Sequence, residues 1–452
     1  MTYDEAISFL CSFISYERSH DWKYTSKAFD LSGYRRLLSV LGNPQWSYRT
    51  VHIAGSDGKG SVAAMLATVL REAGLRVGLY TSPHLHDLRE RITVDAVRIP
   101  KKSLAAILAV VKNHLDLYGT SRRGYATFFD LLTATAFMHF RRRKVDVAVI
   151  ETGLGGRLDA TNVLRPEVTI ITRLSLEHTD KLGDTLEEIA AEKLAICHPG
   201  VPCVAAPQTR QILPFMHRWL KERDVPAKFV QNEYVIEADP PQGNQRSLLV
   251  STPDRRRRLS LRLLGAYQPE NAATVCAVVD ILRDRWRGYA PIAEKALRTG
   301  LRDTIWPGRF EILLEKETGW PTTVVLDVAH TERGAASLRQ SLVQFFGRRA
   351  RVVLLGFLRG KDVLGIVGHL VRRGDTLIYT TAPSPRAIPV AELHEMLKHG
   401  LHGHKWVQWR DRPEDALALA REVAGTEKFI VVAGSLYLVG RCREILLRAS
   451  PR

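Results

Sequence analysis

One segment near the start of the chain restricts the fold more than any other. An apolar run over residues 51–54 is followed by a glycine-rich loop, Gly55-Ser56-Asp57-Gly58-Lys59-Gly60. The pattern then predicts a helix over 61–73, ended by Gly74, and a second strand over 76–80. A strand, a glycine loop, a helix and another strand in this order indicate the beginning of a parallel sheet.

The same alternation continues along most of the 452 residues. After a helical opening over 3–41, with an aromatic-rich loop at 20–24, we expect helices over 103–118, 128–142, 185–196, 271–287 and 292–300. Apolar runs predict buried strands over 145–150 and 168–172, and a further strand begins at 201–204. Short alternating runs with Pro and Gly turns predict β-hairpins over 228–261.

A second α/β set follows a break at 300–308, where Trp306-Pro307-Gly308-Arg309 ends the helical pattern. We expect strands over 323–327, 351–356, 376–380 and 429–433, separated by helices over 334–346, 362–372 and 390–398. The predicted fold class is α/β. A doubly wound N-terminal domain with the glycine loop covers 1–302, and a smaller Rossmann-like α/β domain covers 303–452.

The glycine loop has the physical parts of a phosphate-binding site, although Gly60 separates Lys59 from Ser61 and breaks the usual GxxxxGK[ST] spacing. Glycines allow backbone N–H groups to turn toward an anion, and the helix that begins at Ser61 adds its dipole. Lys59 can offset phosphate charge, and the Ser61 hydroxyl can ligate Mg²⁺. An ordinary glycine-rich turn is the alternative, but the strand before the loop and the helix after it favour phosphate binding.

Two further residues follow apolar strands. Glu151 comes directly after the strand predicted over 145–150, at the carboxyl end where α/β sites form, so its carboxylate can hold a metal. The alternative is that Glu151 only caps the next turn. His178 follows the strand predicted over 168–172, and together with Glu151 and Ser61 we favour it as a second metal ligand.

Composition restricts the partners. The chain has 65 Lys and Arg against 48 Asp and Glu, a formal net charge of +17, but its basic runs over 141–144 and 255–258 are short. Such runs favour solvated turns over a nucleic-acid groove, so we predict no nucleic-acid partner. The five cysteines include no CxxC pair, which argues against a disulfide framework or a zinc site. Without a signal peptide or a long apolar stretch, the chain is expected to be cytoplasmic, away from membranes.

The segment from His52 to Val62 resembles the phosphate loop of the folylpolyglutamate synthase/dihydrofolate synthase family of the Mur ligase superfamily. The glycine between Lys59 and Ser61 separates that family from the other Mur ligases, which have Lys-Thr or Lys-Ser. The resemblance extends in order over roughly residues 35–440. It includes 81–85 with 89–92, 127–130, 151–162, 178–180 with 192–193, 268–272, 306–309, 327–330 and 434–440.

The resemblance implies an ATP-dependent carboxylate–amine ligase that forms an amide through an acyl phosphate. It implies addition of L-glutamate to dihydropteroate, to folates, or to both, with ATP as co-substrate and two Mg²⁺ sites. The partners would be a pteroate- or folate-like acid and an amino acid, and the protein would act as a monomer. Two alternatives stay open: a divergent ligase of specialised biosynthesis with another acid or amino acid, and a nucleic-acid-stimulated ATPase suggested by the charge of +17.

The resemblance also assigns roles to individual residues. It implies that Lys193 is carbamylated, so that its carbamate oxygens ligate metal with Ser61, Glu151 and His178. The expected catalytic residues are Lys59, Lys193, His178 and Arg309. ATP would contact Gly55, Ser56, Asp57, Gly58, Lys59, Gly60, Ser61, Asn271, Arg309 and Asp327. The substrates would contact Ser82, Pro83, His84, Arg89, Thr127, Phe129, Asp159, His330 and Ser435, the last two on the amino-acid side.

One motif departs from the family. The usual Asp-Gly-Ala-His-Asn-Pro is Asp327-Val328-Ala329-His330-Thr331-Glu332 in this chain. Val328 adds volume and disfavours a positive φ, Thr331 has one donor group fewer than Asn, and Glu332 adds a negative charge that could oppose an acidic substrate. We therefore predict an altered acceptor or tail length, with activation of the acid by ATP retained. The alternative is a compensated change that leaves glutamate addition untouched. The preferred acid, the tail length and the linkage stay open.

Overall fold

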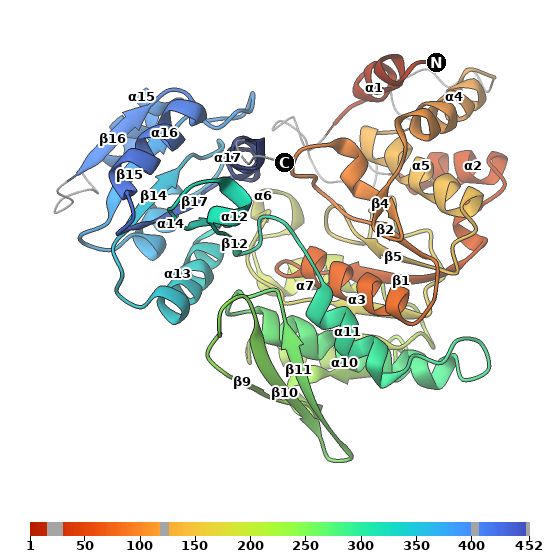
Figure 1. Cartoon of the computed structure of the whole chain (residues 1–452). Helices are drawn as coiled ribbons and strands as arrows, with labels where there is room; N and C mark the ends of the chain where they lie inside the picture. The colour runs from red at the N-terminus through yellow and green to blue at the C-terminus, as the bar shows by residue number, and fades with distance from the viewer. Residues whose placement is uncertain (16–29, 118–125, 399–405, 449–452) are drawn as a thin grey trace.

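The computed structural model describes residues 1–15, 30–117, 126–398 and 406–448, and it confirms the predicted α/β class (Figure 1). The loop predicted at 20–24 and the last residue of the helix predicted over 103–118 lie outside the described residues. Two large sheets dominate the molecule and lie side by side, joined by the segment 304–310 (Figure 1). We call the elements up to α11 the N-terminal lobe and the elements from β12 onward the C-terminal lobe.

The larger sheet has eight strands in the order β4-β3-β2-β5-β1-β6-β7-β8. Only β3 and β4, at one edge, run antiparallel to their neighbours. The strands are β1 (Arg49–Ala54), β2 (Val77–Tyr80), β3 (Ile92–Val94), β4 (Val97–Arg98), β5 (Val147–Glu151), β6 (Val168–Ile171), β7 (Cys203–Ala205) and β8 (Ala227–Phe229). The predicted strands over 51–54, 76–80, 145–150 and 168–172 are therefore correct within a few residues.

Helices cover both faces of this sheet, which is why its central strands are apolar at successive positions. Val149 of β5 packs toward the helices α3 and α10, whereas its neighbour Ile150 packs toward α4 and α5 on the opposite face. The helices of the N-terminal lobe are α1 (Tyr3–Cys11), α2 (Leu31–Val40), η1 (Pro44–Trp46), α3 (Lys59–Glu72), η2 (Leu88–Arg91), α4 (Lys101–Leu117), α5 (Phe128–Arg142), α6 (Thr179–Leu182), α7 (Leu186–Leu194), α8 (Leu213–Lys221), α9 (Val230–Glu233), α10 (Gln268–Arg285) and α11 (Glu294–Asp303).

A small antiparallel sheet lies below the larger one in Figure 1. Its strands are β9 (Val235–Ala238), β10 (Arg246–Thr252) and β11 (Arg255–Leu261). The hairpins predicted over 228–261 are correct for this sheet. The prediction is wrong at its beginning, because β8 pairs parallel to β7 and completes the larger sheet. Three residues are too few for their periodicity to distinguish the two pairings.

The C-terminal lobe contains a six-stranded sheet in the order β12-β13-β17-β14-β15-β16, in which only β12 is antiparallel. The strands are β12 (Glu311–Leu313), β13 (Val324–Leu326), β14 (Arg351–Leu355), β15 (Thr376–Thr380), β16 (Val407–Arg410) and β17 (Phe429–Ala433). The helices are α12 (Glu315–Thr318), α13 (Glu332–Phe346), α14 (Val363–Leu370), α15 (Val390–Leu397), α16 (Pro413–Ala424) and α17 (Leu436–Arg448). The sequence prediction missed the strands β3, β4, β12 and β16 and the helices α6, α8, α9, α12, α16 and α17. In the described part of the chain no helix is long and apolar enough to cross a membrane.

A buried ion pair fixes two neighbouring strands of the C-terminal sheet. Arg351 begins β14, and its guanidinium lies 2.7 Å from the carboxylate of Asp375, which precedes β15. Only 2% and 1% of the two side chains are exposed. Arg372 donates to the same carboxylate at 3.0 Å, so one anion serves two guanidinium groups.

Replacement of Asp375 should therefore be costly. Asp375→Ala leaves Arg351 and Arg372 without their counter-charge, and we expect the free energy of unfolding to fall by about 3–5 kcal/mol. Urea unfolding followed by circular dichroism measures the loss. Asp303→Ala is the matched control, since Asp303 and its partner Arg302 are half exposed, and it should cost less than about 1 kcal/mol. Equal losses in the two variants would contradict the buried-pair argument.

Candidate active site

The candidate site lies at the carboxyl ends of β1, β2, β5 and β6. The chain places β5 and β2 on one side of β1 and β6, β7 and β8 on the other. The strand order therefore reverses around β1, and the crevice at such a reversal is where α/β sheets bind their ligands. The glycine loop, residues 55–60, leaves β1 at this point and enters α3 at Lys59.

Two glycines of the loop are required by close contacts. Gly55 has φ +142°, and a Cβ there would lie 1.9 Å from the Thr172 hydroxyl oxygen. Gly58 has φ +93°, and its Cβ would lie 2.6 Å from the side-chain oxygen of Asn271. The loop is thus packed between the end of β6 and the first turn of α10. A side chain at either position would displace the backbone that the sequence predicts to bind phosphate.

Two lysines converge on one carbonyl of the loop. Lys59 donates to the Gly55 oxygen at 2.8 Å, and Lys193 of α7 donates to the same oxygen at 2.9 Å. Lys193 is 2% exposed and also pairs with Glu177 at 3.0 Å. Although burial alone would raise the pKa of Glu177, the charges of Lys193 and Lys59 hold it well below its usual range. The sequence analysis missed Glu177, whose signal was its place next to His178 after a buried strand.

Glu151, the last residue of β5, lies at the same edge. It is 3% exposed and accepts a hydrogen bond from the Ser82 amide at 3.1 Å. Burial raises its pKa to about 7, and Lys59, the Ser82 amide and Arg309 oppose this shift. The lysine of the glycine loop and an arginine that follows α11 thus act on one carboxyl group.

A metal at this edge would need a mixed set of donors. In the described ranges no three His, Cys, Asp or Glu side chains lie close enough to hold an ion by themselves. Burial lowers the pKa of His178 to about 4, so its imidazole is neutral near pH 7 and can ligate. Burial raises the pKa of the Glu151 carboxyl, and a cation bound beside it would stabilise its charged form. The Ser61 hydroxyl, 2% exposed, adds an oxygen donor suited to Mg²⁺.

The first turn of α10 supports the start of α3. Gln268, fully buried, donates to the Ser61 hydroxyl oxygen at 3.3 Å and accepts from Asn271 at 2.9 Å. Asn271 in turn lies against Gly58. The structure therefore brings the predicted nucleotide residue Asn271 to the glycine loop, and Gln268 orients Ser61.

The C-terminal lobe contributes Arg309 through the segment that joins the lobes. Asp327 accepts hydrogen bonds from the backbone of Phe310 and of Ala329, both at 2.8 Å, and from the Tyr267 hydroxyl at 3.4 Å. The Asp327 carboxylate therefore anchors the turn that carries Arg309. Burial raises the pKa of Asp327, and the charge of Arg309 opposes this shift. A contact between Asp327 and a ribose stays a prediction.

His330, Ser435 and Lys361 come from neighbouring strand ends of the C-terminal sheet. The Nδ1 atom of His330 lies 2.9 Å from the Val328 carbonyl, and burial lowers the pKa of His330 to about 4. Ser435 accepts from the Leu438 amide at 3.2 Å, at the start of α17. Lys361 follows β14. Burial lowers its pKa, and the charge of Glu177 in the other lobe opposes this shift in part. The sequence analysis missed Lys361, although the glycine turn before it was a signal.

Contacts within the C-terminal lobe and the segment that joins the lobes account for the three residues of 327–332 that depart from the family motif. Val328 is buried and packs against Gly308, and Thr331 caps α13 by accepting from the Gly334 amide at 3.0 Å. Glu332 turns toward α14 and lies 3.6 Å from His369. The expectation that Glu332 opposes an acidic substrate stays a prediction. These contacts favour the alternative in which the three changes are compensated and glutamate addition is untouched.

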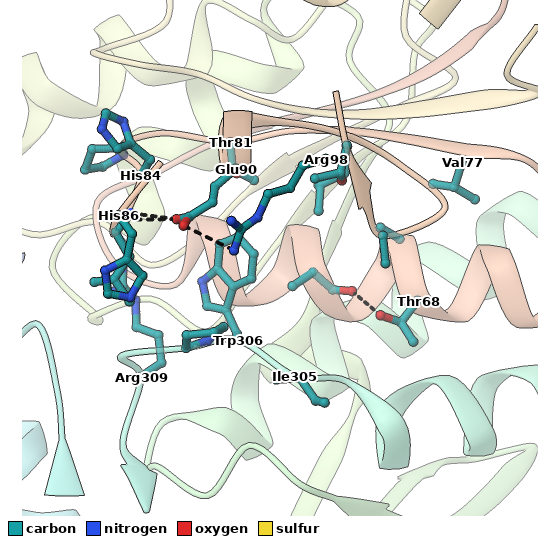
Figure 2. Close-up of a pocket in the computed structure, with 18 of the residues that line it drawn as sticks. Thr68, Val77, Thr81, His84, His86, Glu90, Arg98, Ile305, Trp306 and Arg309 are labelled. Atoms are coloured by element: carbon teal, nitrogen blue, oxygen red, sulfur yellow. Dashed lines mark hydrogen bonds and ion pairs between the residues drawn. The ribbon is translucent and has the colours of Figure 1, made fainter. Parts of the chain in front are cut away.

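A cavity of about 250 Å³ lies beside α3, between the loop after β2 and the C-terminal lobe. Figure 2 shows His84, His86 and Glu90 on one side and Trp306 and Arg309 on the other. Glu90 accepts from the Leu85 amide at 2.8 Å and pairs with Arg98 at 3.4 Å, which holds the loop in shape. Positive side chains outnumber negative ones around the cavity, since four arginines face two acids: Arg71, Arg98, Arg309, Arg443, Glu90 and Asp95.

One contact between the lobes closes this cavity on the side of α17. A Cβ at Gly440 of α17 would lie only 2.5 Å from the Leu85 carbonyl oxygen. The helix therefore rests directly on the loop that follows β2.

The residues predicted to bind the substrates fall into separate places. Pro83 and His84 line the cavity, whereas the other seven, including Arg89, Thr127, Phe129 and Asp159, do not. Arg89 pairs with Asp87 at 2.5 Å, and Thr127 caps α5 by accepting from Asp130 at 3.1 Å. Asp159 accepts from the amides of Gly153 and Leu154, both at 2.9 Å, and Phe129 packs against Gly153. Thr127, Phe129 and Asp159 thus belong to a second group, beside the loop after Glu151.

Comparisons with known proteins agree with this arrangement. The chain matches the Mur ligase middle domain over residues 53–279 and the Mur ligase glutamate ligase domain over residues 308–436. It is 31% identical over 445 residues to the dihydrofolate synthase/folylpolyglutamate synthase of Bacillus subtilis, covering 96% of this chain and 100% of that protein. It is 32% identical to the folylpolyglutamate synthase of Lacticaseibacillus casei over 99% of each chain.

A solved structure is equally similar. The folylpolyglutamate synthase of Mycobacterium tuberculosis, complexed with ADP and AMPPCP, has a TM-score of 0.83 and 30% identity. The match covers 92% of this chain and 95% of that one.

The close packing at Gly55 gives a test of the glycine loop. Gly55→Ala must displace the loop or Thr172, and strain of ~1–3 kcal/mol should weaken MgADP binding by about tenfold or more. Isothermal titration calorimetry measures the affinity. Gly200→Ala is the control, because Gly200 also has positive φ but has nothing within 4 Å of a Cβ. Unchanged affinity in folded Gly55→Ala would contradict the assignment.

Proposed function

The chain belongs to the dihydrofolate synthase/folylpolyglutamate synthase family of Mur ligases, and from that premise we propose that it joins L-glutamate to dihydropteroate, to folates, or to both, with ATP as co-substrate. We expect it to act as a monomer in the cytoplasm. One arrangement supports this most: Lys59 donates to the Gly55 carbonyl of the loop, Arg309 of the joining segment lines the adjacent cavity, and the charges of both oppose the raised pKa of Glu151. A nucleotide at the glycine loop would be enclosed by cations from both sides.

The proposed reaction has two steps at the enclosed nucleotide. The carboxylate of the acid attacks the γ-phosphate of ATP, which gives an acyl phosphate and ADP. The amine of the amino acid then attacks the acyl carbon, and phosphate leaves. Lys59 and Arg309 offset the negative charge that grows on the transferred phosphoryl group. Closure of the lobes over bound substrates would keep out water, which would otherwise hydrolyse the acyl phosphate.

Mg²⁺ fits the oxygen donors at this edge, and we expect two ions. Ser61, Glu151, His178 and carbamylated Lys193 would hold them, and bound Mg²⁺ supplies further charge neutralisation at the phosphates.

The two substrates would occupy different places. The arginine-rich cavity beside α3 suits an acid that carries carboxylates, since its positive side chains outnumber the negative ones. His330, Ser435 and Lys361 suit the amino acid, because Lys361 is half-buried and its ammonium faces the other lobe near Glu177. A half-buried ammonium of this kind would pair with a substrate carboxylate.

A substrate panel tests the proposal. The protein is incubated with MgATP and every combination of dihydropteroate, tetrahydrofolate and unrelated aromatic acids with L-glutamate, D-glutamate, L-aspartate and glycine. Release of ADP and the mass of the product are measured together. We expect ADP and a product larger by one glutamyl residue only with a pteroate or folate and L-glutamate. A product with another acid or amino acid would instead favour the divergent ligase.

The carbamate on Lys193 gives a separate prediction. Lys193→Ala removes the metal-binding oxygens, so turnover should fall by at least ~10²-fold. Formate or acetate in the buffer should restore part of it, because a short carboxylate fits the space left by the side chain. Lys316→Ala, an exposed position on α12, is the control and should change nothing.

A spectroscopic measurement completes this test. Wild-type protein equilibrated with ¹³C-labelled CO₂ should show a carbamate carbon signal that Lys193→Ala lacks. A folded Lys193→Ala variant with normal turnover, or a wild-type protein without the signal, would contradict the carbamate.

A further inference from the structure

An ion pair connects the glycine loop to the C-terminal lobe. Arg333, the second residue of α13, lies with its Nε atom 3.5 Å from a carboxylate oxygen of Asp57. Its terminal nitrogen Nη1 donates to the Leu174 carbonyl at 3.4 Å. One side chain of the C-terminal lobe therefore contacts both the loop and the segment that supports the loop.

Asp57 is fixed within this arrangement. Its amide donates to the Arg173 carbonyl at 3.0 Å, and its carboxylate accepts from the Ser175 hydroxyl at 3.0 Å. Ser56 and Ser175 bond to each other in both directions, through the Ser56 hydroxyl, the Ser175 amide and the Ser175 carbonyl. The Asp57 carboxylate cannot turn away from the loop without breaking these contacts.

A carboxylate in a loop that receives a triphosphate is electrostatically unfavourable, because like charges repel at short range. Burial and the nearby anion Glu177 raise the pKa of Asp57, and the charges of Lys59 and Lys193 oppose this shift only in part. Both lysines also donate to the Gly55 carbonyl, and Lys193 would lose its positive charge as a carbamate. A further cation beside Asp57 therefore favours binding of the phosphates.

The position of Arg333 in α13 has no local explanation. A cation in the first turn of a helix faces the positive end of the helix dipole and weakens the helix. Arg339, later in the same helix, instead contacts its own lobe by donating to the His369 carbonyl at 3.4 Å. The contacts of Arg333 lie across the interface, and they account for an arginine at this place.

We propose that Arg333 is a positioning residue for the ligase reaction: by neutralising Asp57, it lets the glycine loop bind ATP at full strength only when the C-terminal lobe is seated. The proposal rests on the function proposed above. The affinity for nucleotide would then be coupled to the position of the C-terminal lobe against the glycine loop. Without Arg333, the Asp57 carboxylate would repel the phosphates of the nucleotide.

A double-mutant cycle tests the pair. Binding of MgADP to the full chain is measured by isothermal titration calorimetry for wild type, R333A, D57N and the double variant. R333A should weaken binding about three- to fivefold at low salt, the range of a partly exposed ion pair. In the D57N background the same replacement should have almost no effect, because no carboxylate is left to neutralise.

Two further comparisons separate charge from structure. The effect of R333A should shrink in 0.5 M salt, since partly exposed charges are screened, and R333K should retain most of the affinity. R339A replaces the same residue type on the same helix and should match wild type. If R333A fails to fold, R333K, D57N and the salt dependence of the wild type still measure the coupling.

The outcomes are distinguishable from a failure of the proposed function. An equal loss from R333A in both backgrounds, or no loss at low salt, would overturn the role of Arg333 even if the substrate panel succeeds. A wild-type protein that binds no MgADP, or that gives no product in the panel, would contradict the proposed function instead.

Discussion

The carbonyl oxygen of Gly55 is the point on which the site depends. It accepts from Lys59 and from Lys193, at 2.8 and 2.9 Å, and so holds two ammonium groups from two helices beside the end of β1. This is possible only because Gly55 has no side chain, since a Cβ would overlap Thr172. The residue that follows the central strand therefore determines where both lysines, and through Lys193 also Glu177, are located.

From this point charged contacts extend the site across the lobes, beside the apolar packing of Leu85 against the C-terminal core. Arg309 and Lys59 act on Glu151, Lys361 acts on Glu177, and Arg333 pairs with Asp57. Lys361 and Arg333 of the C-terminal lobe thus face acids of the N-terminal lobe. Such an interface is weakened by salt and by water, so its stability depends on what is bound between the lobes.

Much of this could be predicted from the sequence. The glycine loop, the strand that ends at Glu151 and the α/β alternation follow from local pattern, and they identify the sheet edge at which the candidate site lies. Glu177 and Lys361 could not be chosen in advance, because a single charged residue after a strand is common and only the packing of two lobes brings these together. Arg333 had no signal, since in the chain it is one arginine among many.

The departures from prediction have physical causes. β8 was assigned to a hairpin because its three residues carry no periodicity of their own, and only pairing with β7 decides its place. Thr127 and Asp159 match a binding motif, yet their side chains bond to nearby backbone amides and shape the loops of the N-terminal lobe. A sequence motif shows which residues occur together, but it does not distinguish a structural role from a binding role.

The contact between Gly440 and the Leu85 carbonyl has a mechanical consequence. Since a single carbon atom at Gly440 would already overlap the backbone of the loop, α17 has reached its limit of approach there. Any rotation that presses the two sheets together pivots on this steric stop, whereas rotation the other way meets no backbone obstacle at that point. The cavity beside α3 can therefore widen around a longer ligand, but it cannot collapse in that direction when the ligand leaves.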